Sequence, residues 1–108
     1  MSELYFIPGR PAKHPDEHDN YISYQQLTVA DTAVGLTVPP NANKAIIVVE
    51  DATIRWRADG TDPTSIVGTK AFVNATIILD TVGDLSNFKA IRQGSTNAQL
   101  SINYYEHH

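Results

Sequence analysis

Residues 54–68 read IRWRADGTDPTSIVG, and they combine a strand pattern with a sharp change of direction. Successive side chains of a strand point to opposite faces, so Ile54 and Trp56 share one face while Arg55 and Arg57 share the other. The apolar face is expected to pack on the core and the two guanidinium groups to lie at the surface. This stretch therefore predicts a β-strand with Trp56 as a core residue.

The strand runs directly into a corner. Gly60 can adopt a positive φ, and Pro63 has a φ preset for a turn after Asp62. We expect structural roles there for Asp59, Gly60, Pro63 and Gly68. Calcium is an alternative, because Asp59 and Asp62 have the spacing of part of a calcium loop. The third oxygen donor and the distant bidentate Glu of such a loop are missing, so we expect a turn without metal.

The segments on both sides of this corner also read as strands. Residues 44–50, KAIIVVE, are apolar on both faces, which indicates a strand covered on two sides or one clamped between its own core and a partner. Residues 98–105, AQLSINYY, alternate, and the residues expected to point inward are Ala98, Leu100, Ile102 and Tyr104.

Further strands are expected from 27–38, from 71–82 as one or two strands, and from 83–95 after a Gly-Asp turn. Residues 39–44, PPNANK, form a corner because paired prolines cannot serve in a central ladder. No capped stretch carries helical apolar spacing over three turns. The pattern predicts an all-β protein: an antiparallel β-sandwich or jelly roll of about six to eight strands, with a closed barrel as the alternative.

The beginning of the chain differs from the rest. Residues 1–24 hold several Pro and Gly residues and the charged stretch HPDEHDN, and no apolar period lasts there. They are expected to form an extended N-terminal arm, residues 25–106 the sandwich domain, and residues 107–108 a tail that is native or an affinity-tag remnant. Aromatic and β-branched residues are unusual in freely moving tails, so the arm is expected to dock through its apolar residues, Tyr5, Phe6, Ile7, Tyr21, Ile22 and Tyr24.

Composition excludes several classes of protein. The chain has 108 residues, a net charge of -4 and no cysteine, which rules out disulfides, thiolate metal sites and a cysteine nucleophile. Eight basic residues are thinly spread, so neither nucleic acid nor an anionic membrane is an expected partner. The start of the chain has no signal-peptide pattern and no apolar run of membrane-spanning length, so synthesis in a cytoplasm is expected.

Catalytic and metal-binding patterns are weak. His14 and His18 lie four residues apart among carboxylates, a spacing that would suit zinc on a helix, but Pro15 between them favours an extended segment. Carboxylates come in sequence-adjacent pairs, yet no nucleophile elbow, phosphate loop or zinc-protease motif accompanies them. We expect no enzyme activity, no catalytic residue, no cofactor and no bound metal.

Arg55, Trp56 and Arg57 could instead form a stacking platform for a sugar or for single-stranded bases. Strand alternation argues against this platform, because the indole and the guanidinium groups would lie on opposite faces. The arginines would then pair with Asp59, with Asp62 or with carboxylates of a neighbouring subunit, or face water.

Residues 46–69, with LSNFKAIRQGS and LSINYY further on, resemble a group of small structural proteins of tailed bacteriophages. The similarity covers roughly residues 27–105, and the corner at 55–64 is its most specific part. The resemblance implies a β-sandwich accessory protein of the virion without catalytic residues, in particular a capsid decoration or cement protein.

The resemblance and the arm together predict how such a protein would act. The arm and the sandwich edges are expected to bind the major capsid protein, or another virion protein, on the shell exterior, with the capsid surface favoured over the tail. The residues expected to make these contacts and those between subunits of a homo-oligomer, a dimer or trimer, are Tyr5, Phe6, Ile7, Tyr21, Ile22, Tyr24, Arg55 and Arg57. The alternative is a fibre-associated or tail-associated module that binds a carbohydrate or receptor through Tyr105, Arg55 and Arg57.

Overall fold

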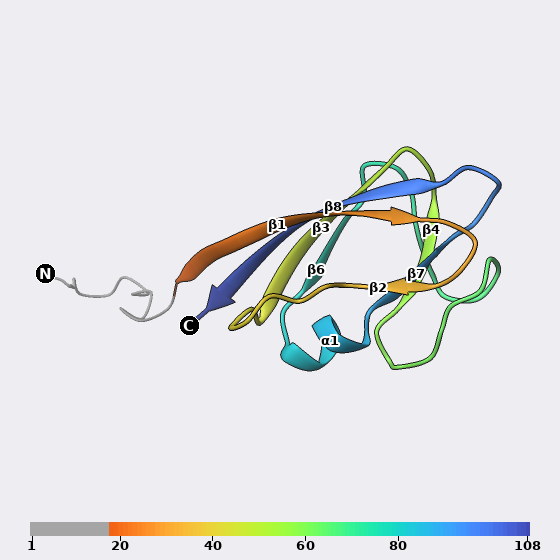
Figure 1. Ribbon diagram of the computed structural model, residues 1–108. Helices are drawn as coiled ribbons and strands as arrows, with labels where there is room; N and C mark the ends of the chain where they lie inside the picture. The colour runs from red at the N-terminus through yellow and green to blue at the C-terminus, as the bar shows by residue number, and fades with distance from the viewer. Residues whose placement is uncertain (1–17) are drawn as a thin grey trace, which may run out of the picture.

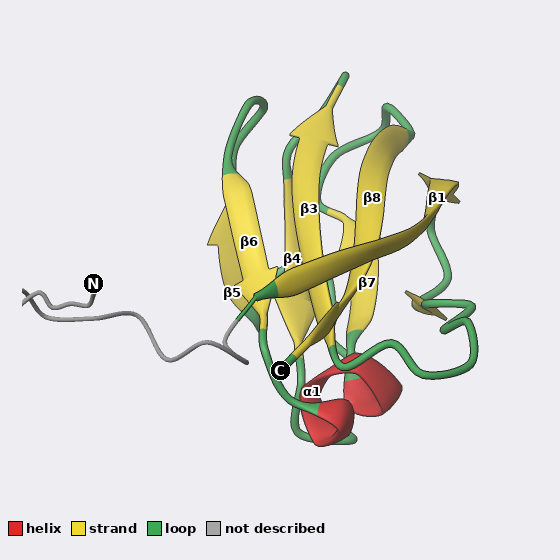
Figure 2. Ribbon diagram, turned by 90° about the vertical axis from the view of Figure 1, so that its left-hand side faces the viewer, coloured by secondary structure: helices red, strands yellow, loops and turns green. Residues whose placement is uncertain are grey.

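The computed structural model describes residues 18–108, which form two four-stranded antiparallel sheets around one core (Figures 1 and 2). Sheet 1 has the strand order β1-β8-β3-β6 and sheet 2 the order β2-β7-β4-β5. The strands of sheet 1 are β1 (Asp19–Val29), β8 (Ala98–His107), β3 (Lys44–Glu50) and β6 (Thr76–Leu79). Those of sheet 2 are β2 (Val34–Gly35), β7 (Lys89–Arg92), β4 (Ile54–Arg57) and β5 (Thr69–Ala71). The prediction of an all-β antiparallel sandwich is confirmed.

The pairing of strands is nested along the chain. β1 pairs with β8, β2 with β7, β3 with β6 and β4 with β5, all antiparallel. A single long hairpin folded over on itself gives this order. Early and late residues therefore meet in both sheets, and β6 and β5 end their sheets on the same side of the sandwich (Figure 2).

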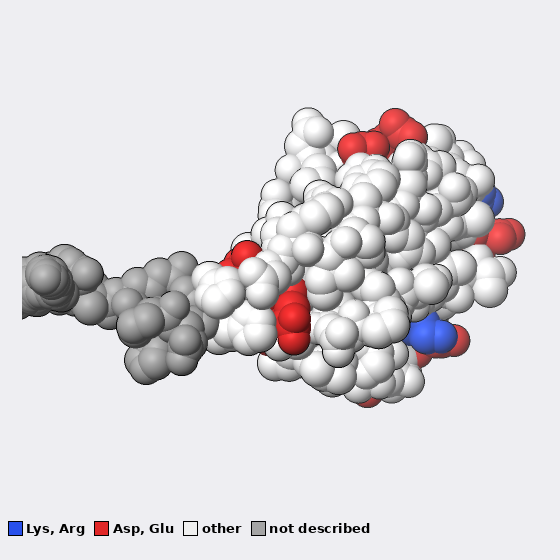
Figure 3. Space-filling model, turned by 60° about the vertical axis from the view of Figure 1, so that its left-hand side comes forward, with Lys and Arg blue, Asp and Glu red and all other residues white. Residues whose placement is uncertain are grey.

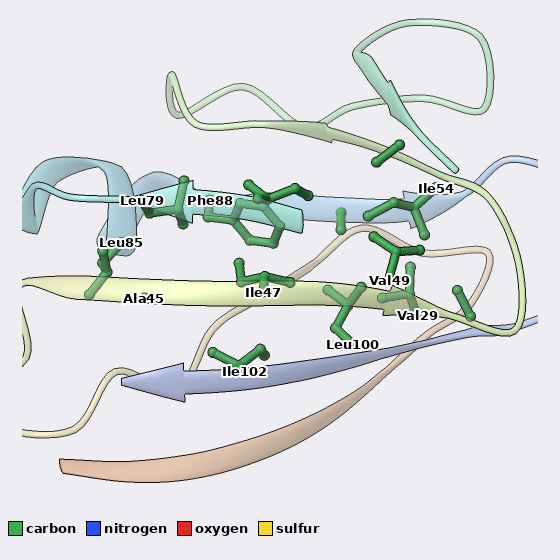
Figure 4. Close-up of a cluster of buried hydrophobic side chains, with 14 of the residues drawn as sticks. Val29, Ala45, Ile47, Val49, Ile54, Leu79, Leu85, Phe88, Leu100 and Ile102 are labelled. Carbon is green, nitrogen blue, oxygen red and sulfur yellow. The ribbon is translucent and has the colours of Figure 1, made fainter. Parts of the chain in front are cut away.

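The apolar alternation of β3 and β8 builds the centre of sheet 1. In β3, Ala45, Ile47 and Val49 are buried, while Ile46 and Val48 point outward and are half-buried. The four residues of β8 predicted to point inward are all buried, so that prediction is confirmed. Figure 4 shows side chains of β3 and β8 facing those of sheet 2 across the core. Each such buried aliphatic side chain contributes about 1.5–3 kcal/mol.

One polar group is buried with this core. Tyr104 is 1% exposed, and its hydroxyl donates a 2.5 Å hydrogen bond to Oε1 of Gln25 on β1. Burial disfavours the charged phenolate and raises the pKa of Tyr104 to about 12. The hydroxyl therefore stays protonated and keeps its partner at neutral pH.

The predicted boundary between arm and sandwich at residues 24 and 25 is wrong. β1 begins at Asp19, so residues 19–24 pair with β8 and are part of sheet 1. A register shift between Tyr21 and Ser23 accommodates Ile22, whose side chain packs against the core. Local composition could not reveal this pairing because the partner strand lies about eighty residues later.

The two ends of this part of the chain also meet. His107 belongs to β8 and lies opposite Asp19, so the predicted separate tail at 107–108 is corrected to a strand end. The predicted anchors Tyr5, Phe6 and Ile7 lie outside the described residues.

A short helix, α1 (Val82–Asn87), replaces the Gly-Asp turn expected before β7. Thr81 caps it, since Oγ1 of Thr81 accepts a 3.0 Å hydrogen bond from the amide of Asp84. Leu85 is the one buried residue of α1, so the helix has no apolar face long enough to be recognised in the sequence. Within residues 18–108, no helix is long and apolar enough to cross a membrane.

Candidate functional site

β4 places the arginines and the tryptophan of the predicted site. Ile54 is buried, and the half-buried indole of Trp56 packs on the same core, where it stacks on Phe88 with ring centroids 5.6 Å apart. Trp56 thus lies on the inward face of sheet 2, as strand alternation predicts. It is not sealed from solvent, however, because it lines two shallow hollows at the surface.

Arg55 is engaged within the chain. Its Nε donates to Oε1 of Gln93 at 3.0 Å, and its Nη1 donates to the backbone carbonyl oxygen of Gly68 at 3.0 Å. The guanidinium group therefore joins β4 to the end of the corner and to the residue that follows β7. These neutral partners were not among the alternatives expected for Arg55, which were carboxylates or water.

Arg57 forms an ion pair with Asp59 at the surface, in which the guanidinium donates two hydrogen bonds to the carboxylate. Oδ1 of Asp59 also accepts a 3.2 Å hydrogen bond from the amide of Thr61, which is an Asx-turn. The hydrogen bond from Arg57, followed by that from the Thr61 amide, lowers the pKa of Asp59. This carboxylate already has partners, which favours the turn over the calcium alternative.

The corner is held by backbone geometry. Gly60 and Gly68 have φ of 85° and 134°, in the region that disfavours side chains. A Cβ on Gly68 would lie 3.1 Å from Cβ of Pro63 and 3.1 Å from the carbonyl oxygen of Trp56. Pro63 itself is buried. The corner thus presents a fixed surface, with Ile66 79% exposed at its tip.

Two shallow hollows adjoin the indole of Trp56. One, of about 370 Å³, is lined by Trp56, Arg57, Ala58, Asp59, Val67, Gly68 and Thr69. The other, of about 340 Å³, opens between the edges of β5 and β6, and its lining includes Trp56, Lys70, Phe72 and Ile78. Both offer an aromatic surface beside charged groups, and neither contains a nucleophile paired with a base. This chemistry suits binding of a polar ligand more than catalysis.

The predicted tyrosines lie on the opposite sheet. Tyr21 and Tyr24 project from the outer face of β1, and their hydroxyls donate to Oδ1 of Asn103 at 3.2 Å and to Oγ of Ser101 at 3.1 Å. The ring of Tyr21 also meets that of Tyr105 edge-on, with centroids 5.5 Å apart. The structure therefore separates the predicted contact residues into a tyrosine set on sheet 1 and an arginine set on sheet 2.

Three apolar residues on the same face of sheet 1 were not among the predicted contact residues: Ile46, Val48 and Ile78. The two-sided apolar pattern of residues 44–50 was the sequence signal for the first two. Ile78 could not be assigned to a face, because the pattern around it left one or two strands open.

A polar cluster closes the end of sheet 1 where the described chain begins. The Asp19 carboxylate contacts Nζ of Lys44 at 2.8 Å and Nδ1 of His107 at 2.5 Å. The hydrogen bond from Lys44 first, and then that from His107, lowers the pKa of Asp19. Among residues 18–108, no three His, Asp or Glu side chains are placed to hold a metal ion. His14, of the predicted histidine pair, lies outside that range.

Comparisons with family models, with curated proteins and with solved structures give no match to this chain.

Proposed function

We propose that this chain is a non-enzymatic structural protein of a bacteriophage particle, in particular a decoration or cement protein of the capsid exterior. One observation carries the structural side of the proposal: the outer surface of the sandwich exposes apolar and tyrosine side chains, while Arg55 and Arg57 of β4 are bonded within the chain. Tyr21 is 57% exposed, Tyr24 52% and Ile78 59%. Such a surface suits adhesion to another protein and offers no reaction centre.

The energetics of many copies favour this role. Burying one exposed tyrosine or isoleucine side chain contributes about 1.5–3 kcal/mol, so a few contacts per copy give measurable binding. Copies bound side by side on one lattice would strengthen one another through avidity. The chain reaches its stability without cysteine, through the interleaved side chains of two sheets.

The major capsid protein is the partner we favour, with the capsid surface preferred over the tail and a homo-oligomer as the bound form. The nested strand order is the one a jelly roll adopts, and jelly rolls recur in viral capsid and lectin domains. This likeness of architecture is an analogy and does not by itself assign a role. Residues 1–17, with Tyr5, Phe6 and Ile7, complete the proposal as the segment that fastens the sandwich to the shell.

Co-sedimentation with purified empty shells tests this function. The full chain should sediment with shells to a saturable ratio, and shells carrying it should resist heating better than bare shells. Removal of residues 1–17 should weaken binding while the sandwich remains folded. The truncation should stop before β1, because a cut at residue 24 would remove the strand pairing of residues 19–24. Failure of the full chain to bind shells would contradict the proposal.

A carbohydrate-binding module of a fibre or tail is the second candidate. The hollow beside Trp56, Arg57 and Asp59 favours it, because an indole surface with nearby polar groups suits a sugar ring. Trp56 is the only tryptophan, so the intrinsic tryptophan fluorescence comes from the indole that lines this hollow and the neighbouring one. A saturable fluorescence change with bacterial surface oligosaccharides, kept after removal of residues 1–17, would favour this candidate over shell binding.

A further inference from the structure

β3 is apolar on both faces, but the described chain covers only one of them. Its outward residues Ile46 and Val48 lie beside two neighbouring strands, and Ile46 is opposite Ile78 of β6. On the other side, Ile46 is opposite Asn103 of β8, which in turn is opposite Tyr24 of β1. We call this surface the sheet 1 face and define it by its apolar and aromatic residues, Tyr21, Tyr24, Ile46, Val48, Ile78 and Tyr105.

The middle of the sheet 1 face carries no charge. The outward residues of β3 between Lys44 and Glu50 are Ile46 and Val48, and those of β8 opposite them are uncharged as well. Figure 3 looks onto this side of the molecule and shows the charged side chains around a broad uncharged area. A neutral face neither repels its own copy nor selects a strongly charged partner.

Many polar groups on this face already have partners within the chain. In addition to the bonds of the two tyrosine hydroxyls, Gln99 exchanges hydrogen bonds with Thr28 at 2.9 and 3.3 Å. The Ser101 hydroxyl donates to Glu50 at 2.8 Å. Burying a polar group is costly mainly when it loses its hydrogen bonds, so this face can be covered at a low desolvation cost. The rings of Tyr21 and Tyr24 are also held in place, which reduces the entropy lost on binding.

We propose that the sheet 1 face binds the same face of a second copy of this chain, giving a two-fold symmetric dimer. The four strands of this face have 11, 10, 7 and 4 residues. At about 3.3 Å per residue and about 4.8 Å between strands, they give a face of roughly 500 Å². Two such faces bury roughly 1,000 Å², which is about the smallest area of a specific interface. Two-fold symmetry lets one neutral patch serve both partners.

The end charges select the direction of the second copy. If the two β3 strands ran parallel, the Glu50 carboxylate of one copy would approach that of the other. An antiparallel arrangement keeps the two Glu50 carboxylates apart and places each one toward the Lys44–Asp19 ion pair of the other copy. This dimer would form in solution, so the inference does not depend on the proposed binding to a phage shell.

Light scattering coupled to size-exclusion chromatography tests the dimer with the full chain. The wild type should elute with twice the monomer mass of 11.9 kDa at micromolar concentrations and dissociate on dilution. Ile78→Lys and Tyr24→Ala should each raise the dimer dissociation constant at least about tenfold, because every substitution occurs twice per interface. Ile66→Lys is the matched control: Ile66 is 79% exposed but lies in the corner away from sheet 1, so this variant should remain dimeric.

Circular dichroism and thermal unfolding of each variant separate lost association from lost folding. A wild type that stays monomeric at its highest soluble concentration overturns the inference without any variant, as does a monomer that binds only shell protein through this face. A dimer unaffected by both Ile78→Lys and Tyr24→Ala, or disrupted equally by Ile66→Lys, also overturns it.

Discussion

The Nη1 of Arg55 donates a hydrogen bond to the backbone carbonyl oxygen of Gly68, 3.0 Å away, and so ties the end of the corner back to β4. The same guanidinium group bonds the side chain of Gln93, beyond β7. Strand alternation assigns Arg55 to the surface, but its side chain links three segments: β4, the end of the corner and the residue that follows β7.

Replacing Arg55 by alanine should therefore destabilise the fold. Loss of two hydrogen bonds from a charged donor is expected to reduce the free energy of unfolding by about 1–3 kcal/mol. Arg57→Ala, which removes a surface ion pair on the same strand, is the control and should change stability much less. Urea unfolding followed by Trp56 fluorescence measures both. An equal loss in the free energy of unfolding for the two substitutions would contradict the proposed linking role of Arg55.

Gly68→Ala should strain the corner. Gly68 has φ of 134°, and an added Cβ would meet Pro63 and the Trp56 carbonyl at 3.1 Å. We expect a loss of about 1–3 kcal/mol in the free energy of unfolding. Gly94→Ala provides the control, because nothing lies within 4 Å of a Cβ there and its φ is not positive. It should be neutral or slightly stabilising. A neutral Gly68→Ala variant would refute the packing described for this corner.

Tyr104 should make stability sensitive to alkaline pH. Its pKa is about 12 in the folded chain against 10.0 for the free side chain, so the folded state prefers the protonated phenol. This contribution to stability is complete below pH 10 and should be lost as the pH rises toward 12. Tyr104→Phe should be less stable at neutral pH, because it loses the bond to Gln25, but should show a smaller further loss over this alkaline range.

Denaturant midpoints measured at several pH values between 9 and 12 check this prediction about Tyr104. Tyr105→Phe, which removes a hydroxyl from the outer side of the same strand, serves as the control and should keep the wild-type alkaline response. An identical response of the Tyr104→Phe variant would contradict the assignment.

Asp19 should hold the ends of β1 and β8 together above acidic pH. Lys44 and His107 lower the pKa of its carboxyl group below 3.8, so its contribution is present above that pH and is lost as the pH falls through the lowered value. Asp19→Asn should speed hydrogen exchange of the His108 amide, which donates to the His18 carbonyl. The His108 amide should exchange equally fast in the wild type and in Asp19→Asn once the pH is below the lowered pKa of Asp19. Glu106→Gln, which alters a longer contact to His108, is the control.

Alternation and turn chemistry in the sequence determined most of the architecture. The inward residues of β8, the opposite facing of Trp56 and Arg55, and the corner at Gly60 and Pro63 all follow from period-two patterning and from preferred backbone angles. These are local properties, because each depends on residues within one strand or one turn. The two-sided apolar pattern of residues 44–50 likewise signalled that β3 has apolar side chains on both faces.

Only the tertiary structure decided which segments pair. The pairing of Asp19 with His107 joins residues that no local pattern connects, and it converts residues 19–24 from an expected arm into half of β1. Helix α1 could not be predicted from the sequence, because its single buried residue, Leu85, gives no helical repeat of apolar positions. The internal bonds of Arg55, and the division of contact residues between two sheets, depend on strand order. Strand order is set by the packing of both sheets on one core. The free energy of that packing depends on residues far apart in the sequence, so no local pattern reveals it.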